Sequence, residues 1–279
     1  MTSTTTTPTM SGVRLSFPRL VRSEWIKLRS IRSTIWCYAI LVVITIAMAV
    51  LLGSVVDAPP QGGGQDQVNS LFVSFATASV TFTALVVGVL GVLIITGEYG
   101  TGQIRSTFTA DPGRTGAVLA KALVLALTTF LVSAVSTWIG VVAAAALQAG
   151  NGIHPDVADP AVVLPILGSS VYVTLVALLA FGFGLLVKSS AGGIAITLGI
   201  LLVLPIIVQL LAALTGAQWV ADLSQFLPSQ AGGQLYSPAT TQQPGTGLQL
   251  DGWGGFAVLA AEVLVVGGIA LAAARTREV

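Results

Sequence analysis

Residues 71–96 read LFVSFATASVTFTALVVGVLGVLIIT, and this uncharged, apolar stretch decides the fold. A helix needs about 20 apolar residues to cross the hydrocarbon core of a bilayer. The stretch is too long for a barrel strand and shows no alternation of apolar and polar residues. It therefore predicts a transmembrane helix.

Five more stretches have the same character, and the composition agrees with them. Charged residues make up 8% of the chain and hydrophobic residues 54%, whereas a soluble domain carries about 25% charged residues. We therefore predict an all-α membrane protein with one transmembrane domain over residues 34–274. Its six helices are expected at residues 34–56, 71–96, 118–147, 161–187, 191–214 and 253–274.

The basic residues all fall on one side of these six predicted spans. They are Arg14, Arg19, Arg22, Lys27, Arg29, Arg32, Arg105, Arg114, Lys121, Lys188, Arg275 and Arg277. The loops on the other side carry aspartates and no lysine or arginine. Cytoplasmic loops are enriched in Lys and Arg, so we expect a multi-pass plasma-membrane protein with both termini in the cytoplasm. Residues 1–13 would be a disordered tail and residues 275–279 a cytoplasmic tail.

Residues 14–33 have the pattern of a basic amphipathic helix that lies in the membrane interface. Its role is either to anchor the topology on anionic lipid or to dock a cytoplasmic partner. Glu24 lies among the apolar residues of this helix, where a lone carboxylate is costly unless it is paired. We expect its partner to be Arg32 or a basic residue of the first cytoplasmic loop.

That loop, residues 97–114, reads GEYGTGQIRSTFTADPGR. Its glycines do not make a phosphate loop, because no strand precedes them and GxxxxGK[ST] occurs nowhere in the chain. The loop instead predicts a short helix from about residue 101 to 110. Ile104 and Phe108 are four residues apart and share a face of that helix. They either insert into a partner's groove or pack against the protein's own helices.

Two further features lie outside these cytoplasmic segments. Trp219, Leu223, Phe226 and Leu227 are spaced as on a helix within the external loop 215–252. They predict a short amphipathic helix at the outer leaflet, or alternatively a loop with one packed turn. His154 is isolated, and no metal cluster, nucleophile–base pair or nucleic-acid motif is visible, so we predict no catalytic residue and no metal site.

Glu262 lies near the middle of the sixth predicted span. A charge at that depth costs about 2.5–3.5 kcal/mol on insertion scales. The carboxyl group would therefore either line a substrate pathway or form a structural hydrogen bond with a neighbouring helix. The hydroxyls that could accept or donate such a bond are those of Ser133, Ser136, Thr137 and Thr174.

Three stretches, in register with the six spans, resemble the type-2 ABC exporter permeases, especially the actinobacterial ones. They are SEWIKLRS at residues 23–30, EYGTGQIRST at 98–107 and FLPSQAG at 226–232. The resemblance implies a half-transporter in which two membrane subunits, identical or different, pair with two separate ATP-binding subunits. ATP and Mg would be bound by those partners, and this chain would bind no cofactor.

The same resemblance assigns roles to the cytoplasmic segments. The N-terminal helix and the first cytoplasmic loop would contact the ATPase, and the family's external re-entrant helices correspond to the loop after the fifth span. The residues placed at the ATPase contact are Glu24, Glu98, Gln103, Ile104, Arg105 and Phe108. Glu262 matches none of the three stretches, and we place it in the substrate pathway.

A different class of membrane protein is the alternative. The chain could be a secondary transporter with Glu262 as its proton site, or a membrane-anchored regulatory or immunity protein without an ATPase partner. The broken helices and internal symmetry of many secondary transporters are not evident in the sequence. Co-purification with an ATPase subunit would separate these classes.

Overall fold

The structure is a computed structural model that describes residues 16–55, 64–110, 115–238 and 248–276. The predicted N-terminal tail at residues 1–13 lies outside the described residues, as do Arg14, Arg114 and Arg277. The described part of the chain contains helices and no strand, which confirms the all-α prediction. Its elements are α1 (Phe17–Ser30), α2 (Arg32–Val55), α3 (Gln65–Thr77), α4 (Val80–Gly100), α5 (Gln103–Ala110), α6 (Thr115–Gly150), α7 (Pro160–Val187), α8 (Ser190–Leu198), a π-helix η1 (Gly199–Val203), α9 (Leu204–Thr215), α10 (Gln218–Ser224), α11 (Pro228–Gly233) and α12 (Gly252–Thr276).

Six helical stretches among the described residues are long and apolar enough to cross a membrane, which confirms the predicted number. They are Arg32–Val55, Gln65–Gly100, Thr115–Gly150, Pro160–Val187, Ser190–Thr215 and Gly252–Thr276. The second and third are each 36 residues long, longer than the predicted spans. The extra turns of the second stretch are polar at the end away from α5, where Asn69 donates to Asp159 and Gln65 donates to the backbone carbonyl of His154.

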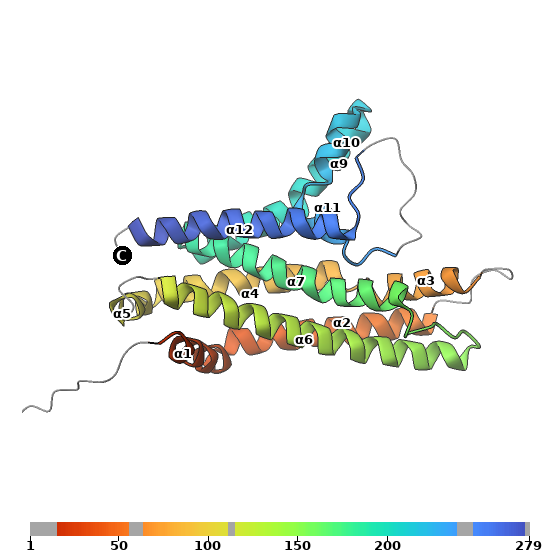
Figure 1. The fold of residues 1–279 in the computed structure, drawn as a ribbon, viewed down its shortest axis with the longest axis horizontal. Coiled ribbons are helices and arrows are strands. Elements are labelled where there is room, and N and C mark those ends of the chain that lie inside the picture. Colours follow the sequence, from red (N-terminus) through yellow and green to blue (C-terminus); the bar gives the residue numbers. More distant parts are fainter. Residues whose placement is uncertain (1–15, 56–63, 111–114, 239–247, 277–279) are drawn as a thin grey trace, which may run out of the picture.

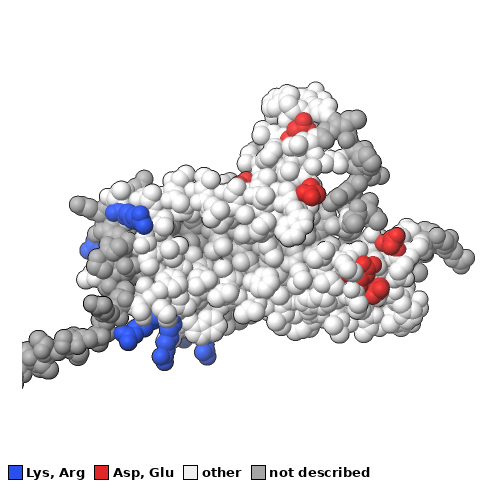
Figure 2. Space-filling model, in the orientation of Figure 1, with Lys and Arg blue, Asp and Glu red and all other residues white. Residues whose placement is uncertain are grey.

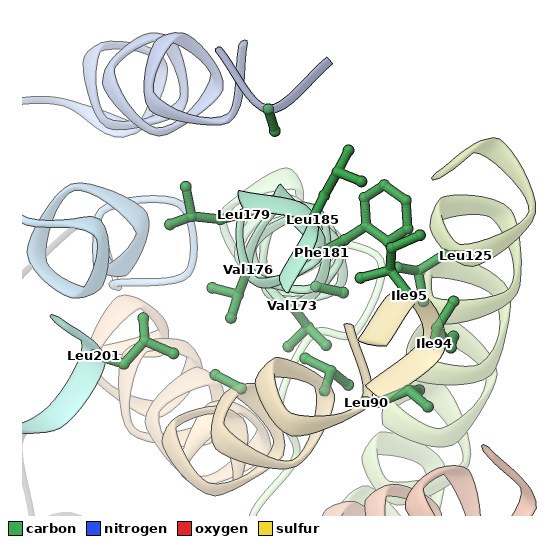
Figure 3. Packing of buried hydrophobic residues seen from close by; sticks show 14 of the residues in the cluster. Leu90, Ile94, Ile95, Leu125, Val173, Val176, Leu179, Phe181, Leu185 and Leu201 are labelled. Atoms are coloured by element: carbon green, nitrogen blue, oxygen red, sulfur yellow. The ribbon is translucent and has the colours of Figure 1, made fainter. Parts of the chain in front are cut away.

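The centre of the bundle is the contact between α4 and α7. Gly91 of α4 lies so close to α7 that an added Cβ would be 2.3 Å from the carbonyl oxygen of Ala177. Figure 3 shows Val173 and Val176 of α7 pointing toward α4, with Leu125 and Leu201 on opposite sides of the cluster. Small residues let the two backbones approach closely, as is usual for helices that pack in lipid.

The fifth span is bent rather than straight. α8 continues into η1, where the amide of Leu204 bonds the carbonyl of Gly199 five residues earlier, and Pro205 follows at once. Figure 1 shows α9 and α10 leaving the side of the bundle instead of following its long axis. Proline lacks an amide hydrogen and disturbs the regular ladder, so the bend falls where the backbone bonding is already irregular.

The described part of the segment between the fifth and sixth spans forms two short helices, α10 and α11. α10 ends at Ser224, so Phe226 and Leu227 lie in the connection to α11 and do not extend the predicted amphipathic helix. α11 is wedged against α7 and α12, and a Cβ on Gly232 would be 2.1 Å from the Tyr172 ring. The FLPSQAG stretch thus has a packing role in this fold.

The charges that are visible in Figure 2 separate along the long axis of the molecule. Figure 2 shows Lys and Arg gathered at the end where α1 and α5 lie, and Asp and Glu spread over the other half. This view agrees with the one-sided distribution of basic residues in the sequence. We refer to the end with the lysines and arginines as the basic end.

Candidate functional site

Four charged side chains meet at the basic end, and we call them the ionic cluster: Glu24, Lys27, Glu98 and Lys121. Lys27 Nζ lies 2.8 Å from Glu24 Oε1 and 3.0 Å from Glu98 Oε1. Lys121 Nζ lies 2.9 Å from Glu98 Oε1 and also donates to Glu24 Oε2. Each ammonium group therefore contacts both carboxylates.

The cluster joins three elements that are far apart in the sequence. Glu24 and Lys27 belong to α1, Glu98 lies in the last turn of α4, and Lys121 lies in the second turn of α6. Glu24, Glu98 and Lys121 are only 4%, 5% and 6% exposed. Removing one partner of a buried ion pair typically costs about 3–5 kcal/mol, because the other charge remains buried. The cluster therefore fixes α1 to the bundle.

Lys27 is the most exposed member of the ionic cluster, and the two forces on its charge oppose one another. Burial acts to lower its pKa, but the hydrogen bonds and charges of Glu24 and Glu98 outweigh burial and raise the pKa above its ordinary value. The ammonium form is therefore held charged by the carboxylates. Oε2 of Glu98 is buried without a hydrogen-bond partner among the described residues.

The pairing of Glu24 differs from the sequence prediction. Its partners are Lys27 and Lys121, not Arg32 or a basic residue of the first cytoplasmic loop. Lys27 could have been found from the sequence, because residues three apart share a helix face. Lys121 could not, because only the packing of α1 on α6 brings it within reach.

The short helix α5 was predicted with the right position, but Ile104 does not point outward. Ile104 is 2% exposed and belongs to the main hydrophobic core, so it packs against the protein's own helices. The exposed side chains of α5 include those of Gln103 and Arg105. The side chain of Phe108 lies outside the described residues.

Two contacts that the sequence did not reveal join further pairs of helices. The ammonium of Lys188, at the junction of α7 and α8, lies 5.3 Å from the centre of the Tyr99 ring of α4. The hydroxyl of Tyr38 in α2 lies 2.8 Å from that of Thr128 and 3.0 Å from that of Thr129, both in α6. The first contact connects α4 with the α7–α8 junction, and the second connects α2 with α6.

Glu262 lies elsewhere, on α12, beside an open groove of about 570 Å³. Its Oε2 is buried without a hydrogen-bond partner among the described residues. The hydroxyls of Ser133, Ser136 and Thr174 donate to carbonyls of their own helices instead. The structural hydrogen bond, one of the two alternatives for Glu262, is therefore not formed by Oε2 with these three hydroxyls or with Thr137. Among the described residues no group of three or more His, Cys, Asp or Glu side chains could hold a metal.

Comparison with known proteins gives one family. Residues 20–204, which are more than half of the chain, match the family described as ABC-2 family transporter protein. The matched region covers most of α1, all of α2 to α8 and η1, and thus every member of the ionic cluster. A search of curated proteins found no match.

Proposed function

We propose that this chain, which belongs to the ABC-2 family of transporter proteins, is the permease subunit of an ATP-driven exporter. Members of that family are non-catalytic membrane permeases that work with ATP-binding subunits. Two permease chains would form the substrate pathway, and two separate subunits would bind ATP and Mg. The proposal places the chain in the plasma membrane with both termini in the cytoplasm.

The main observation that supports this proposal is the ionic cluster. A cytoplasmic helix that responds to a partner must be rigidly connected to the spans that it moves. α1 is connected in this way, because Glu24 and Lys27 bond side chains of α4 and α6 that are buried at the ends of those spans. A displacement of α1 would therefore be transmitted directly to two transmembrane helices.

The ATPase contact itself would lie on the exposed faces of α1 and α5. Gln103 and Arg105 are exposed on α5, and Trp25 and Ile26 are exposed on α1. Glu24, Glu98 and Ile104 are buried inside the subunit. We therefore propose that these three residues hold the contact surface in place and do not touch the ATPase.

The second permease would cover the projecting α9. Its side chains Ile206, Ile207, Leu210 and Leu214 are each more than half exposed. A helix that is apolar on all sides is stable in lipid, so exposure alone does not require a partner. The bend away from the bundle favours one, because it directs α9 away from the long axis of the bundle (Figure 1) and leaves most of its side chains exposed.

Adding negative charge to α5 tests the ATPase contact. The double change Gln103→Glu and Arg105→Glu should leave folding intact, because both side chains are exposed, but should reduce co-purification with the ATP-binding subunit. Arg275→Glu, exposed at the same end of the molecule, is the matched control. Normal co-purification and normal transport by the double variant would remove α5 from the coupling role.

Cysteine labelling tests the orientation separately. In a Cys37→Ala background, Asp66→Cys at the start of α3 should react with a membrane-impermeant maleimide in intact cells. Ser106→Cys on α5 should react only after the cells are permeabilised. Labelling of position 106 from outside would reverse the proposed topology.

A further inference from the structure

The groove beside Glu262 has walls from four parts of the fold. α7 contributes Leu179 and Phe183, and the bent fifth span contributes Ile200 and Leu204. The connection between α10 and α11 closes one side with Phe226, and α12 supplies Glu262 itself. At about 570 Å³ the groove is within the range of sites that bind small molecules, roughly 300–1,000 Å³.

One polar group faces this apolar space. Every lining residue except Glu262 is apolar, and no described lysine or arginine lines the groove. Arg275, the basic residue of α12, is 13 residues farther along the helix, about 20 Å at 1.5 Å per residue. The carboxyl group of Glu262 therefore has no cationic partner from the described part of this chain at its own depth.

We propose that this groove binds a lipophilic organic cation, with Glu262 as the counter-ion. The apolar walls would take up the hydrocarbon part, and the carboxylate would compensate the positive charge, which is expensive to leave alone in a low-dielectric site. Phe183 and Phe226 add aromatic faces that attract cations. Charge complementarity thus selects this ligand class over neutral lipids and organic anions.

The site is distinct from the ATPase contact and does not depend on it. The groove lies beside α12 and α9, whereas the ionic cluster joins α1, α4 and α6. Binding can therefore be measured on the permease chain alone, without nucleotide. A negative result would leave the assignment as an exporter subunit unaffected.

The test is equilibrium dialysis of the full chain in nanodiscs of zwitterionic phosphatidylcholine. Radiolabelled tetraphenylphosphonium is the probe, and tetraphenylborate, of nearly the same shape but opposite charge, is its control. Empty nanodiscs give the partitioning into lipid, which is subtracted. The variants are Glu262→Gln, which removes the charge, and Ala261→Phe, which fills the groove but keeps the carboxyl group. Asp251→Asn removes an exposed carboxylate just before the same helix.

We expect saturable binding of tetraphenylphosphonium to the wild-type chain and to Asp251→Asn. Glu262→Gln should bind it about tenfold or more weakly, because the counter-charge in a low-dielectric site is lost. Ala261→Phe should also bind it weakly, and tetraphenylborate should not saturate. Thermal melting and size-exclusion profiles establish that each variant is folded. Equal binding by folded Glu262→Gln, equal binding of the borate, or no saturable binding to the wild type would each overturn the proposal.

Discussion

The inner and outer spans of this bundle have the same hydropathy but very different surroundings. The inner spans Gln65–Gly100 and Pro160–Val187 have mean hydropathies of 2.5 and 2.3 in their most apolar stretches, and 61% of the residues in those stretches are buried. The outer spans Ser190–Thr215 and Gly252–Thr276 reach 2.7 and 2.3, with 17% and 11% buried. Hydropathy therefore identifies a span without indicating its place in the bundle.

Polar residues distinguish the inner spans from α12, whereas the other outer span also buries a hydroxyl residue, Thr197. The inner spans contain buried hydroxyl residues such as Thr83, Thr96, Ser169 and Ser170. Thr96 donates to the carbonyl of Val92 in its own helix, so its polar atom is satisfied without water. The outer helix α12 has no serine or threonine before Thr276. A buried hydroxyl marks the face of a span that contacts other helices, as Thr197 does where it packs against Gly88, and α12, which has none before its last residue, is suited to lipid.

The largest expected effect concerns paired and unpaired charges. Lys121→Met should reduce the free energy of unfolding by about 3–5 kcal/mol, because it leaves Glu24 and Glu98 buried with Lys27 as their remaining partner in the ionic cluster. Glu262→Leu on outer helix α12 should be neutral or stabilising, because Oε2 has no hydrogen-bond partner among the described residues. The stability of both variants is measured by thermal unfolding, monitored by size-exclusion chromatography. Equal destabilisation by the two changes would contradict the distinction.

Glycine substitutions should separate the inner contact from the outer surface. Gly91→Ala on α4 should cost about 1–3 kcal/mol, because the added Cβ would lie 2.3 Å from the carbonyl oxygen of Ala177. Gly267→Ala on α12 meets nothing within 4 Å and should gain up to about 1 kcal/mol from helix propensity. The same thermal assay applies. A stabilised Gly91→Ala variant would show that α4 and α7 are less tightly packed than described.

A smaller effect on stability is expected at a hydrogen bond between an inner span and an outer span. The hydroxyls of Thr96 in α4 and Ser190 in α8 lie 2.8 Å apart. Ser190→Ala should reduce the free energy of unfolding by about 0.5–1.5 kcal/mol, the usual contribution of one hydrogen bond. Ser74→Ala is the control, because its hydroxyl is exposed and bonds only its own helix. Indistinguishable melting curves for the two variants would mean that this contact does not hold α8.

The smallest effect on stability is expected at α9. Leu210→Ser with Leu214→Ser should change the unfolding free energy of the isolated chain by no more than about 0.5 kcal/mol, because both side chains are exposed. Chemical cross-linking in native membranes should nevertheless show less of the permease dimer. Undiminished cross-linking would place the second permease on another surface.

The sequence predicted the spans well because their length and lack of charge are one-dimensional properties. It placed Glu24 correctly as a buried carboxylate that needs a partner, but the choice of Lys121 depends on the packing of α1 against α6. Ile104 shows the same limit, since the four-residue spacing identified its face without telling whether that face points inward or outward. The roles of Gln103, Arg105 and Phe108 in ATPase coupling remain predictions.

The bend in the fifth span also links the position of α9 to the width of the groove beside Glu262. α9 is 12 residues long, about 18 Å at 1.5 Å per residue, and it begins directly after the π-helix Gly199–Val203. A rotation of 10° at that π-helix would move the far tip by about 3 Å, roughly the diameter of a water molecule. Ile200 lies in this π-helix and Leu204 directly follows it, and both line the groove beside Glu262. The same small rotation would therefore alter the width of the groove. A small change in backbone angle at the π-helix would thus change both the position of the α9 tip and the width of the groove.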